Sequence, residues 1–131
     1  MDAVSKALKD ITLARGRKAE DKFFEAMRTS ASADMPRWFR SVRRPTFKED
    51  RYEGKDAVIE TTDVGKLFLQ IKSSKAGETH FKKSRHSRRN KFISVIVILE
   101  RDTLEDVRIK ARVALSQLRQ EILNKRNITE W

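Results

Sequence analysis

Residues 56–72, DAVIETTDVGKLFLQIK, are the stretch that decides the fold of this chain. Two runs rich in apolar residues flank a polar turn at Asp63 to Gly65, a pattern that predicts two adjacent strands joined as a hairpin. Successive side chains on a strand point to opposite faces, so Phe68, Gln70 and Lys72 share one face of the second strand.

The first strand of this hairpin adds a carboxylate to the polar groups of the second. Asp56, Val58 and Glu60 are expected to share a face by the same alternation. Unpaired charge on a buried face is costly, so such groups indicate a function rather than packing. A carboxylate, an amide oxygen and an ammonium together are suited to holding a divalent metal ion against a phosphodiester. A solvated strand face is the ordinary alternative.

The remaining elements follow from apolar spacing and from turn residues. We expect a first helix over about 2–27, which Gly16 could divide, and a strand at Trp38 to Val42. A charged link at Lys48 to Lys55 leads to the two hairpin strands, around 56–62 and 66–73. A short helix near Glu78 to Ser87, a strand at Phe92 to Leu99 and a last helix over about Thr103 to Asn124 complete the order.

Two of these segments carry more specific expectations. The strand Phe92 to Leu99 is apolar on both faces and β-branched, which suits the middle of a sheet. Asp102 with Glu105 three residues on predicts the capping box that starts the last helix. The apolar stripe of that helix, which would form core or a dimer interface, consists of Leu104, Val107, Ala111, Leu115, Leu118 and Ile122.

The predicted order is therefore α-β-β-β-α-β-α. Such an order indicates an α/β protein with a mixed four-stranded sheet flanked by helices. A chain of 131 residues has the length of one domain with a modest core, so we expect a single domain over 1–131.

The charge balance points to a polyanionic partner. Lys and Arg total 30 against 19 Asp and Glu, a formal net charge of +11. Such an excess favours phosphate contacts that are independent of base sequence and sensitive to salt. The chain has no cysteine, which excludes disulfides and thiolate metal sites. No apolar run has the length of a signal peptide core or a membrane span, so a cytoplasmic location is expected.

Two motifs in this order resemble the PD-(D/E)XK nuclease superfamily. They are Gly54-Lys55-Asp56 and, fourteen residues after Asp56, Gln70-Ile71-Lys72-Ser73-Ser74. Upstream, Gly16-Arg17-Lys18-Ala19-Glu20 is similar to the start of the first core helix of that family. The similarity is closest to small archaeal-type Holliday junction resolvases and restriction-endonuclease-like domains. It spans about 16–100, so the helix at about 103–124 would follow a restriction-endonuclease-like core.

The resemblance implies a role for each of five residues. Asp56 and the carbonyl of Ile71 would bind Mg²⁺ or Mn²⁺, and Gln70 would be a third ligand in a position usually held by an acid. Lys72 would lie beside the nucleophilic water or the scissile phosphate. Glu20 would complete the metal shell, directly or through water. The implied activity is metal-dependent endonucleolytic cleavage of DNA, with branched or structured DNA as the plausible substrate.

Gln70 is the departure from the family pattern, because it removes one negative charge from the site. Glu20, or Glu60 on the first strand, would have to make up the deficit, and Glu25 is a lower-ranked substitute for Glu20. The first alternative hypothesis is therefore a domain of the same fold that binds nucleic acid without cleaving it. The second is a basic structural or ribosome-associated protein in which the arrangement of Asp56, Gln70 and Lys72 is accidental.

The densest basic segment follows the second hairpin strand directly. We expect this segment to contact nucleic-acid phosphates near the site, with DNA favoured over RNA as the partner. A solvated loop or a localisation signal has the same composition and is the alternative. A homodimer would suit cleavage of both strands of a duplex. The expected nucleic-acid-binding residues are Lys75, Lys82, Lys83, Arg85, Arg88, Arg89 and Lys91.

Overall fold

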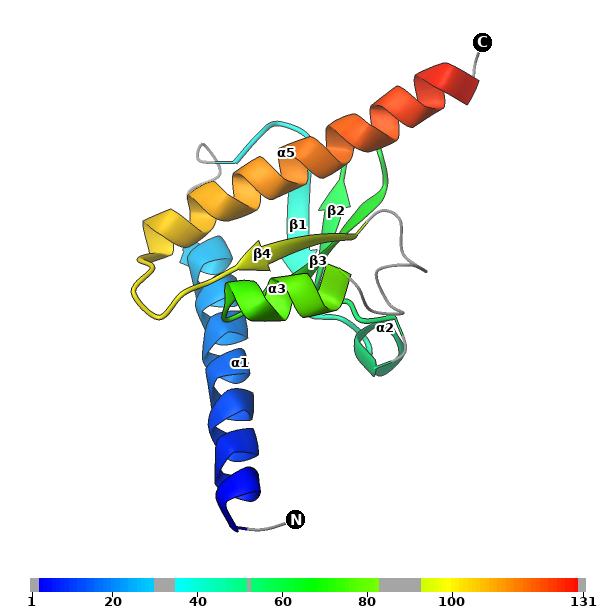
Figure 1. Ribbon diagram of the computed structural model, residues 1–131. Coiled ribbons are helices and arrows are strands. Elements are labelled where there is room, and N and C mark those ends of the chain that lie inside the picture. The colour runs from blue at the N-terminus through cyan, green and yellow to red at the C-terminus, as the bar shows by residue number, and fades with distance from the viewer. Residues whose placement is uncertain (1–2, 30–34, 52, 83–92, 130–131) are drawn as a thin grey trace.

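The computed structural model describes residues 3–29, 35–51, 53–82 and 93–129 (Figure 1). Its elements follow in the order α1 (Ala3–Thr29), β1 (Phe39–Arg43), α2 (Phe47–Arg51), β2 (Ala57–Thr61), β3 (Lys66–Lys72), α3 (Lys75–Lys82), β4 (Ile93–Val97) and α5 (Leu104–Thr129). The predicted order is confirmed, with the short helix α2 in addition. None of the helices in the described ranges combines the length and the apolar character needed to cross a membrane.

The four strands form one mixed sheet in the order β1-β2-β3-β4. β1 and β2 are antiparallel, β2 and β3 form the predicted hairpin, and β3 and β4 are parallel. The hairpin turns at Gly65, whose φ of 80° lies in the region that glycine adopts most easily. In register, Ala57 pairs with Leu69 and Ile59 with Leu67, which sets the apolar side chains of both strands on one face.

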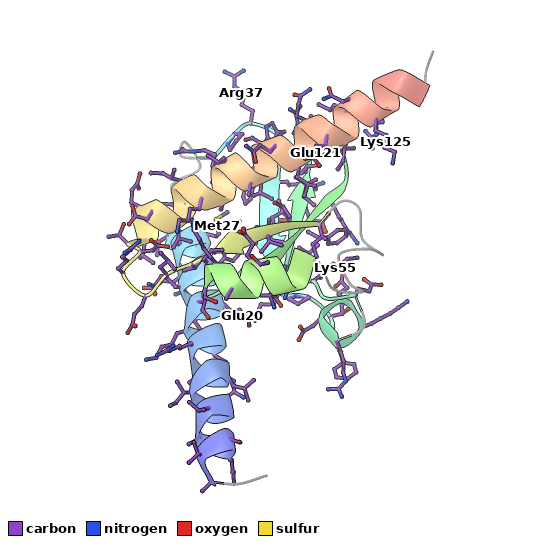
Figure 2. The ribbon with its side chains drawn as sticks, viewed as in Figure 1. Glu20, Met27, Arg37, Lys55, Glu121 and Lys125 are labelled. Carbon is purple, nitrogen blue, oxygen red and sulfur yellow. The ribbon has the colours of Figure 1, made fainter. Side chains whose placement is uncertain are left out.

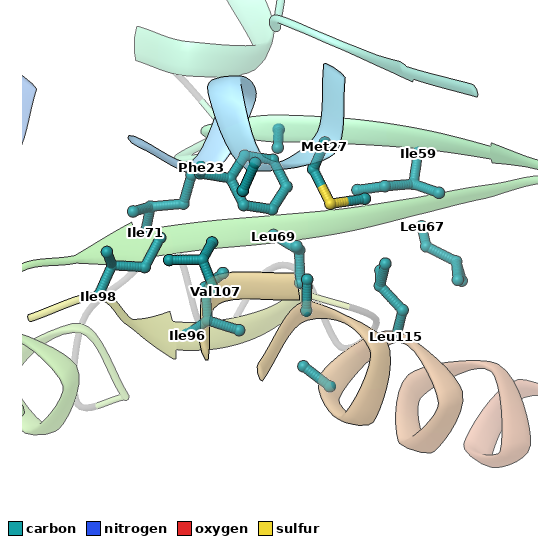
Figure 3. Close-up of a cluster of buried hydrophobic side chains, with 14 of the residues drawn as sticks. Phe23, Met27, Ile59, Leu67, Leu69, Ile71, Ile96, Ile98, Val107 and Leu115 are labelled. Atoms are coloured by element: carbon teal, nitrogen blue, oxygen red, sulfur yellow. The ribbon is translucent and has the colours of Figure 1, made fainter. Parts of the chain in front are cut away.

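That apolar face is covered by α1 and α5. Phe23 and Met27 of α1 and Val107 and Leu115 of α5 are buried against the side chains of the sheet, such as that of Leu69 (Figure 3). The stripe predicted for the last helix is thus core: its four central residues are buried and its two outer ones are partly buried. Burying such a stripe on an apolar sheet face is the main source of stability in a fold of this kind.

The opposite face of the sheet holds the polar residues of β3 and is approached by α3. A Cβ placed on Gly77 of α3 would lie 3.4 Å from Cδ of Lys72, so the helix passes in van der Waals contact with the Lys72 side chain. The predicted start of this helix at Glu78 is late, because Ser74 already caps it: the Ser74 hydroxyl accepts a hydrogen bond from the Gly77 amide at 3.1 Å.

The structure corrects three of the sequence expectations. β4 lies at the edge of the sheet and not in its middle, and its two apolar faces are explained by the helices α3 and α5 that flank it. The capping box is Thr103 with Asp106, one residue later than predicted, whereas Asp102 accepts the Leu99 amide and pairs with Lys110.

The third correction concerns Gly16, which does not divide the first helix. α1 is continuous from Ala3 to Thr29, and nothing lies within 4 Å of a Cβ built at Gly16. A single glycine in a helix interior costs only about 1 kcal/mol relative to alanine, which the packed second half of α1 offsets.

Candidate active site

The backbone before β2 bends so that Asp56 faces the end of β3. Gly54 has a φ of 69°, and the Asp56 amide donates to the carbonyl of Leu69 at 2.8 Å. Leu69 is also the register partner of Ala57. Asp56 itself precedes β2 and is held to β3 by this backbone hydrogen bond. The bend thus sets the Asp56 carboxylate against β3.

The Asp56 carboxylate is buried and bound to the backbone of β3. Its Oδ2 accepts a hydrogen bond from the Ile71 amide at 2.8 Å. Burial is the main influence on its pKa and raises it to about 7, against the opposing effects of this hydrogen bond and of the Lys72 charge. The hydrogen bond and the Lys72 charge thus offset only part of the effect of burial on this pKa.

Gln70 supplies a second buried oxygen, one residue before Ile71 on β3. The residue is only 8% exposed, and its Oε1 has no hydrogen-bond partner among the described residues. Buried polar atoms are nearly always hydrogen-bonded, because desolvation without a partner costs about 1–3 kcal/mol. An unpartnered amide oxygen on the strand that binds the Asp56 carboxylate therefore requires an explanation.

Lys72 projects from the same face of β3 two residues further along. Its positive charge lowers the pKa of both Asp56 and Glu20, which shows that the ammonium lies within electrostatic reach of the two carboxylates. The side chain is half-buried, with α3 against its stem at Gly77. Of the residues predicted from sequence, Asp56 and Lys72 thus lie within electrostatic reach of each other, and Gln70 lies two residues before Lys72 on the same face of β3.

Glu20 of α1 and Asp50 of α2 are the acidic neighbours of this cluster. The pKa of Glu20 is raised, first by burial and then by repulsion from Asp50. Both carboxylates also raise the pKa of Asp56. Asp50 was not predicted from the sequence, although a signal for it exists. Thr46 and Glu49 have capping-box spacing, and the structure shows their reciprocal hydrogen bonds at 2.8 and 3.2 Å. The cap starts α2 and so places Asp50.

Lys55 is a cation on the same sheet face that the sequence reasoning did not single out. Its side chain is largely buried, and its ammonium lies 3.6 Å from the centre of the Phe68 ring and 2.7 Å from Oε2 of Glu53. Phe68 shares its strand face with Gln70 and Lys72. Ring and carboxylate together hold the Lys55 ammonium on this face. Figure 2 shows Glu20 on α1 and Lys55 before β2, toward opposite ends of α3.

The oxygen atoms at this position form an incomplete ligand set for a divalent cation. Asp56 retains Oδ1, Gln70 offers Oε1, and the Ile71 carbonyl points to the side of its amide, past the start of β2. Mg²⁺ accepts such hard oxygen ligands and keeps several waters. Among the residues that the structure describes, however, no group of three or more His, Cys, Asp or Glu side chains is close enough to hold a metal ion.

Other predicted residues lie elsewhere. Glu60 is directed to Arg43, with 3.9 Å between Oε1 and Nε, and its register partner is Lys66 at the far end of β3. Glu60 therefore does not make up the charge that Gln70 lacks. Glu25 lines a groove between α1 and the β4–α5 loop, and it is not among the groups that shift the pKa of Asp56.

The predicted nucleic-acid contacts fall mostly on residues outside the described ranges. Lys75 opens α3 and is exposed. The side chain of Lys82 and the whole of Lys83, Arg85, Arg88, Arg89 and Lys91 lie outside the described residues.

An open groove of about 960 Å³ lies between α1 and the β4–α5 loop, and we call it the α1 groove. Ile11, Lys18, Leu99 and Leu104 contribute to its walls, together with Ser73, the residue after Lys72. Asp56, Gln70 and Lys72 do not line this groove.

Comparisons of the chain with protein-family models, with curated proteins and with solved structures give no match.

Proposed function

We propose that this protein is a metal-dependent endonuclease that hydrolyses DNA phosphodiester bonds, with a restriction-endonuclease-like core and a site of the PD-(D/E)XK type. The observation that carries the proposal is the unpartnered, buried Oε1 of Gln70, on the residue before Ile71, whose amide binds the buried Asp56 carboxylate. A divalent cation at this point would coordinate the amide oxygen and stabilise the charged carboxylate. Both unusual features of the site would then have one cause.

The residues divide the chemistry among them. Asp56, Gln70 and the Ile71 carbonyl would hold Mg²⁺ or Mn²⁺, with Glu20 reaching the ion directly or through water. When bound, the ion supplies charge neutralisation at the phosphate and a lowered pKa of water. Lys72 stabilises negative charge on the phosphate as it develops and orients the attacking water. The basic segment 82–91 would follow the backbone of a bound duplex or branched DNA.

The test is cleavage of supercoiled plasmid and of a synthetic four-way junction with Mg²⁺, Mn²⁺ or EDTA. We expect cleavage with either metal and none with EDTA. Asp56→Asn and Lys72→Met should each abolish cleavage while leaving DNA binding intact. Lys66→Met, at the exposed far end of the same strand, is the matched control and should cut like the wild type. Loss of cleavage in the control as well would argue against a role of Lys72 in the chemistry.

One observation favours a second function, a domain of this fold that binds nucleic acid without cutting it. The neutral Gln70 and the absence of a three-carboxylate group among the described residues both weaken metal binding. In that case the wild type binds DNA but leaves plasmid and junction intact at every metal concentration. A protein that neither binds nor cuts DNA would instead fit the basic structural or ribosome-associated alternative.

A further inference from the structure

The strand β4 leaves one edge of the sheet open. It is the last strand in the sheet order and pairs with β3 on one side. In Figure 1, β4 lies between α5 above and α3 below. A strand in this position carries a row of backbone amides and carbonyls that none of the other described strands pairs with. We call this row the β4 edge.

The backbone groups on the β4 edge belong to alternate residues. The Ile98 amide donates to the carbonyl of Lys72 on β3 at 2.8 Å. Because successive residues of a strand direct their amides and carbonyls to opposite sides, those of Val95 and Val97 point away from β3. Their side chains lie on the face that α3 approaches, since Ile96 and Ile98 belong to the core under α5.

One end of the β4 edge is closed by two side chains. The Lys110 ammonium donates to the Val97 carbonyl at 2.9 Å, and the Leu99 amide donates to the Asp102 carboxylate at 2.8 Å. Lys110 and Asp102 also form an ion pair at 2.6 Å. Both contacts confirm that alternate backbone groups point outward. The open part of the edge thus consists of the Val95 amide and carbonyl and the Val97 amide.

A groove of about 480 Å³ runs along this open part, between α3 and α5. Its α5 wall includes Ala114 and the apolar side chains of Ile109 and Val113, which lie one turn apart and are 42% and 52% exposed. Its α3 wall includes Lys75 and Glu78. A strand in this groove would direct alternate side chains to the two walls, so apolar residues would face α5 and polar residues would face α3.

The charges favour an acidic segment over a second copy of this chain. Lys75 follows Lys72 by three residues, and Lys72 is the register partner of Val97, so the exposed Lys75 ammonium lies toward the closed end of the edge. An Asp or Glu opposite Val97 would face it. Glu78 lies one turn further along α3, which confines the preferred acid to that end. The net charge of +11 attracts an acidic partner, whereas a second copy would bring another +11 to the same edge.

We infer that the β4 edge binds an extended segment of another protein, which adds a strand to this sheet. The segment carries apolar side chains at alternate positions, which pack on Ile109 and Val113, and an acidic side chain beside Lys75. Its backbone bonds to the open groups of Val95 and Val97, because strand addition takes its affinity from such bonds and its specificity from alternate side chains. This interaction does not depend on the proposed function.

The first test is amide hydrogen exchange, followed by NMR. The probe is an acetylated octapeptide in which Val and Asp alternate. In the free protein, the amides of Val95 and Val97 should exchange much faster than those of Ile96 and Ile98, which point to β3. Excess peptide should slow exchange at Val95 and Val97 at least about tenfold. A control peptide with the same residues in two blocks cannot present one apolar face and should bind at least about tenfold more weakly.

The second test changes the open edge and one wall of the groove. Val95→Pro removes an outward amide and keeps the ladder to β3, because proline is tolerated on a free strand edge. It should weaken binding of the labelled peptide at least about tenfold by fluorescence anisotropy, as should Ile109→Glu. Val4→Glu, at an apolar side chain 70% exposed on α1, is the matched control and should bind like the wild type. Circular dichroism should be equal for all four proteins.

Peptide variants test the same bonds with the wild-type protein, so the result does not depend on how Val95→Pro folds. N-methylation of one alternate set of peptide amides should abolish binding, and N-methylation of the other set should leave it unchanged. Lys75→Glu should reverse the charge preference, so that a Val and Lys peptide binds more tightly than the Val and Asp peptide.

Three outcomes would overturn the inference. The first is equal binding of the alternating and block peptides, and the second is an equal effect of the two N-methylated sets. The third is a Val95 amide that is already protected in the free protein. Sedimentation would then identify what covers the edge, as a second copy if the protein is a dimer and as part of the same chain if it is a monomer. Failure of the nuclease assay leaves all of these measurements unchanged.

Discussion

Burial of the Asp56 carboxylate costs desolvation free energy that its contacts only partly offset. The group accepts a single backbone hydrogen bond, and the Lys72 charge does not offset the loss of water around it. Without a bound cation the folded protein therefore favours the protonated form of this carboxyl at pH values where an ordinary Asp is charged. The sign of this effect leads to a prediction about stability.

We predict that the free energy of unfolding falls as pH rises. The pKa of Asp56 is about 7 in the folded protein against 3.8 for an ordinary Asp. Between these values the folded state holds a proton that the unfolded state has released, so stability is lost as pH rises through that window. Denaturant titrations should show that Asp56→Asn removes a decline on the order of 4 kcal/mol between pH 4 and 8.

The same variant tests the metal through stability. At pH 8, Mn²⁺ should raise the melting temperature of the wild type, because binding to the folded state alone stabilises it. Asp56→Asn should show no such rise. Glu121→Gln, which removes an exposed acid on α5 far from Glu20 (Figure 2), should respond like the wild type. An equal rise in all three proteins would place the metal elsewhere.

A substitution at Gln70 should strengthen metal binding, whereas Asp56→Asn should abolish it. Replacing its amide with a carboxylate in Gln70→Glu restores the charge that the site lacks, so Mn²⁺ affinity measured by calorimetry should rise about tenfold, equivalent to about 1.4 kcal/mol. Without metal the variant should be less stable than the wild type at pH 8, because a second carboxylate is then buried near Asp56. Gln120→Glu on the surface of α5 is the control. Unchanged affinity in Gln70→Glu would remove Gln70 from the ligand set.

At the scale of the element, α2 is a five-residue helix that depends on its cap. The hydrogen bonds between Thr46 and Glu49, together with the ion pair of Glu49 to Arg43 at 2.8 Å, tie the helix to the end of β1. This helix places Asp50 beside the site and precedes the bend at Gly54. The geometry of Asp56 thus depends on a short element with no buried residue of its own.

We predict that Thr46→Ala destabilises the protein by about 1 kcal/mol, the usual cost of a lost N-cap. The pKa of Glu49 is lowered to about 2, chiefly by its hydrogen bond with Arg43. Its contribution is therefore complete above its ordinary pKa of 4.5 and is lost as pH falls toward 2. Denaturation midpoints measured between pH 6 and 2 should converge for wild type and Glu49→Gln. Thr62→Ala, an exposed threonine at the end of β2, should behave as wild type throughout.

Helices and strands were predictable from sequence where nearby residues determine them. They were less predictable where packing against other elements determines their position. The hairpin of β2 and β3 follows from alternation and from the turn glycine. The edge position of β4 could not be read from its residues, because helices on both faces produce the same apolar pattern as a central strand. The placement of Asp56 was equally hidden, since it depends on a hydrogen bond to the carbonyl of Leu69, thirteen residues away.

At the scale of the whole molecule, sequence reasoning selected Asp56, Gln70 and Lys72, and the structure sets the Lys72 charge within electrostatic reach of Asp56. It selected them by chemical type and strand parity, both of which are local. It did not exclude Glu60, because strand parity says nothing about which end of a sheet a residue reaches. It did not identify Asp50 or Lys55, whose approach to the site depends on how α2 and the bend at Gly54 fold over β3.

The net charge of +11 is spread over the whole chain and should make DNA affinity depend on salt. The Asp56→Asn variant in EDTA binds without cleavage, and its affinity for a short duplex should fall steeply with salt. Each phosphate contact adds about 0.9 to the magnitude of the slope of log K against log salt. Changing Lys83, Arg85 and Arg88 to Gln should reduce the slope by roughly 2–3 if these residues contact phosphates. Fluorescence anisotropy at several salt concentrations measures both effects.

Charge alone could produce part of that change, so the control must remove the same charge elsewhere. Changing Arg101, Arg112 and Lys125 to Gln neutralises three bases on the β4–α5 loop and α5. This lowers the long-range attraction equally but leaves residues 83–88 unchanged, so its slope should stay within about one of the parent value. If the two triple variants lose the same slope, binding is a diffuse attraction to a basic surface. A larger loss for the 83–88 variant localises the phosphate contacts to that segment.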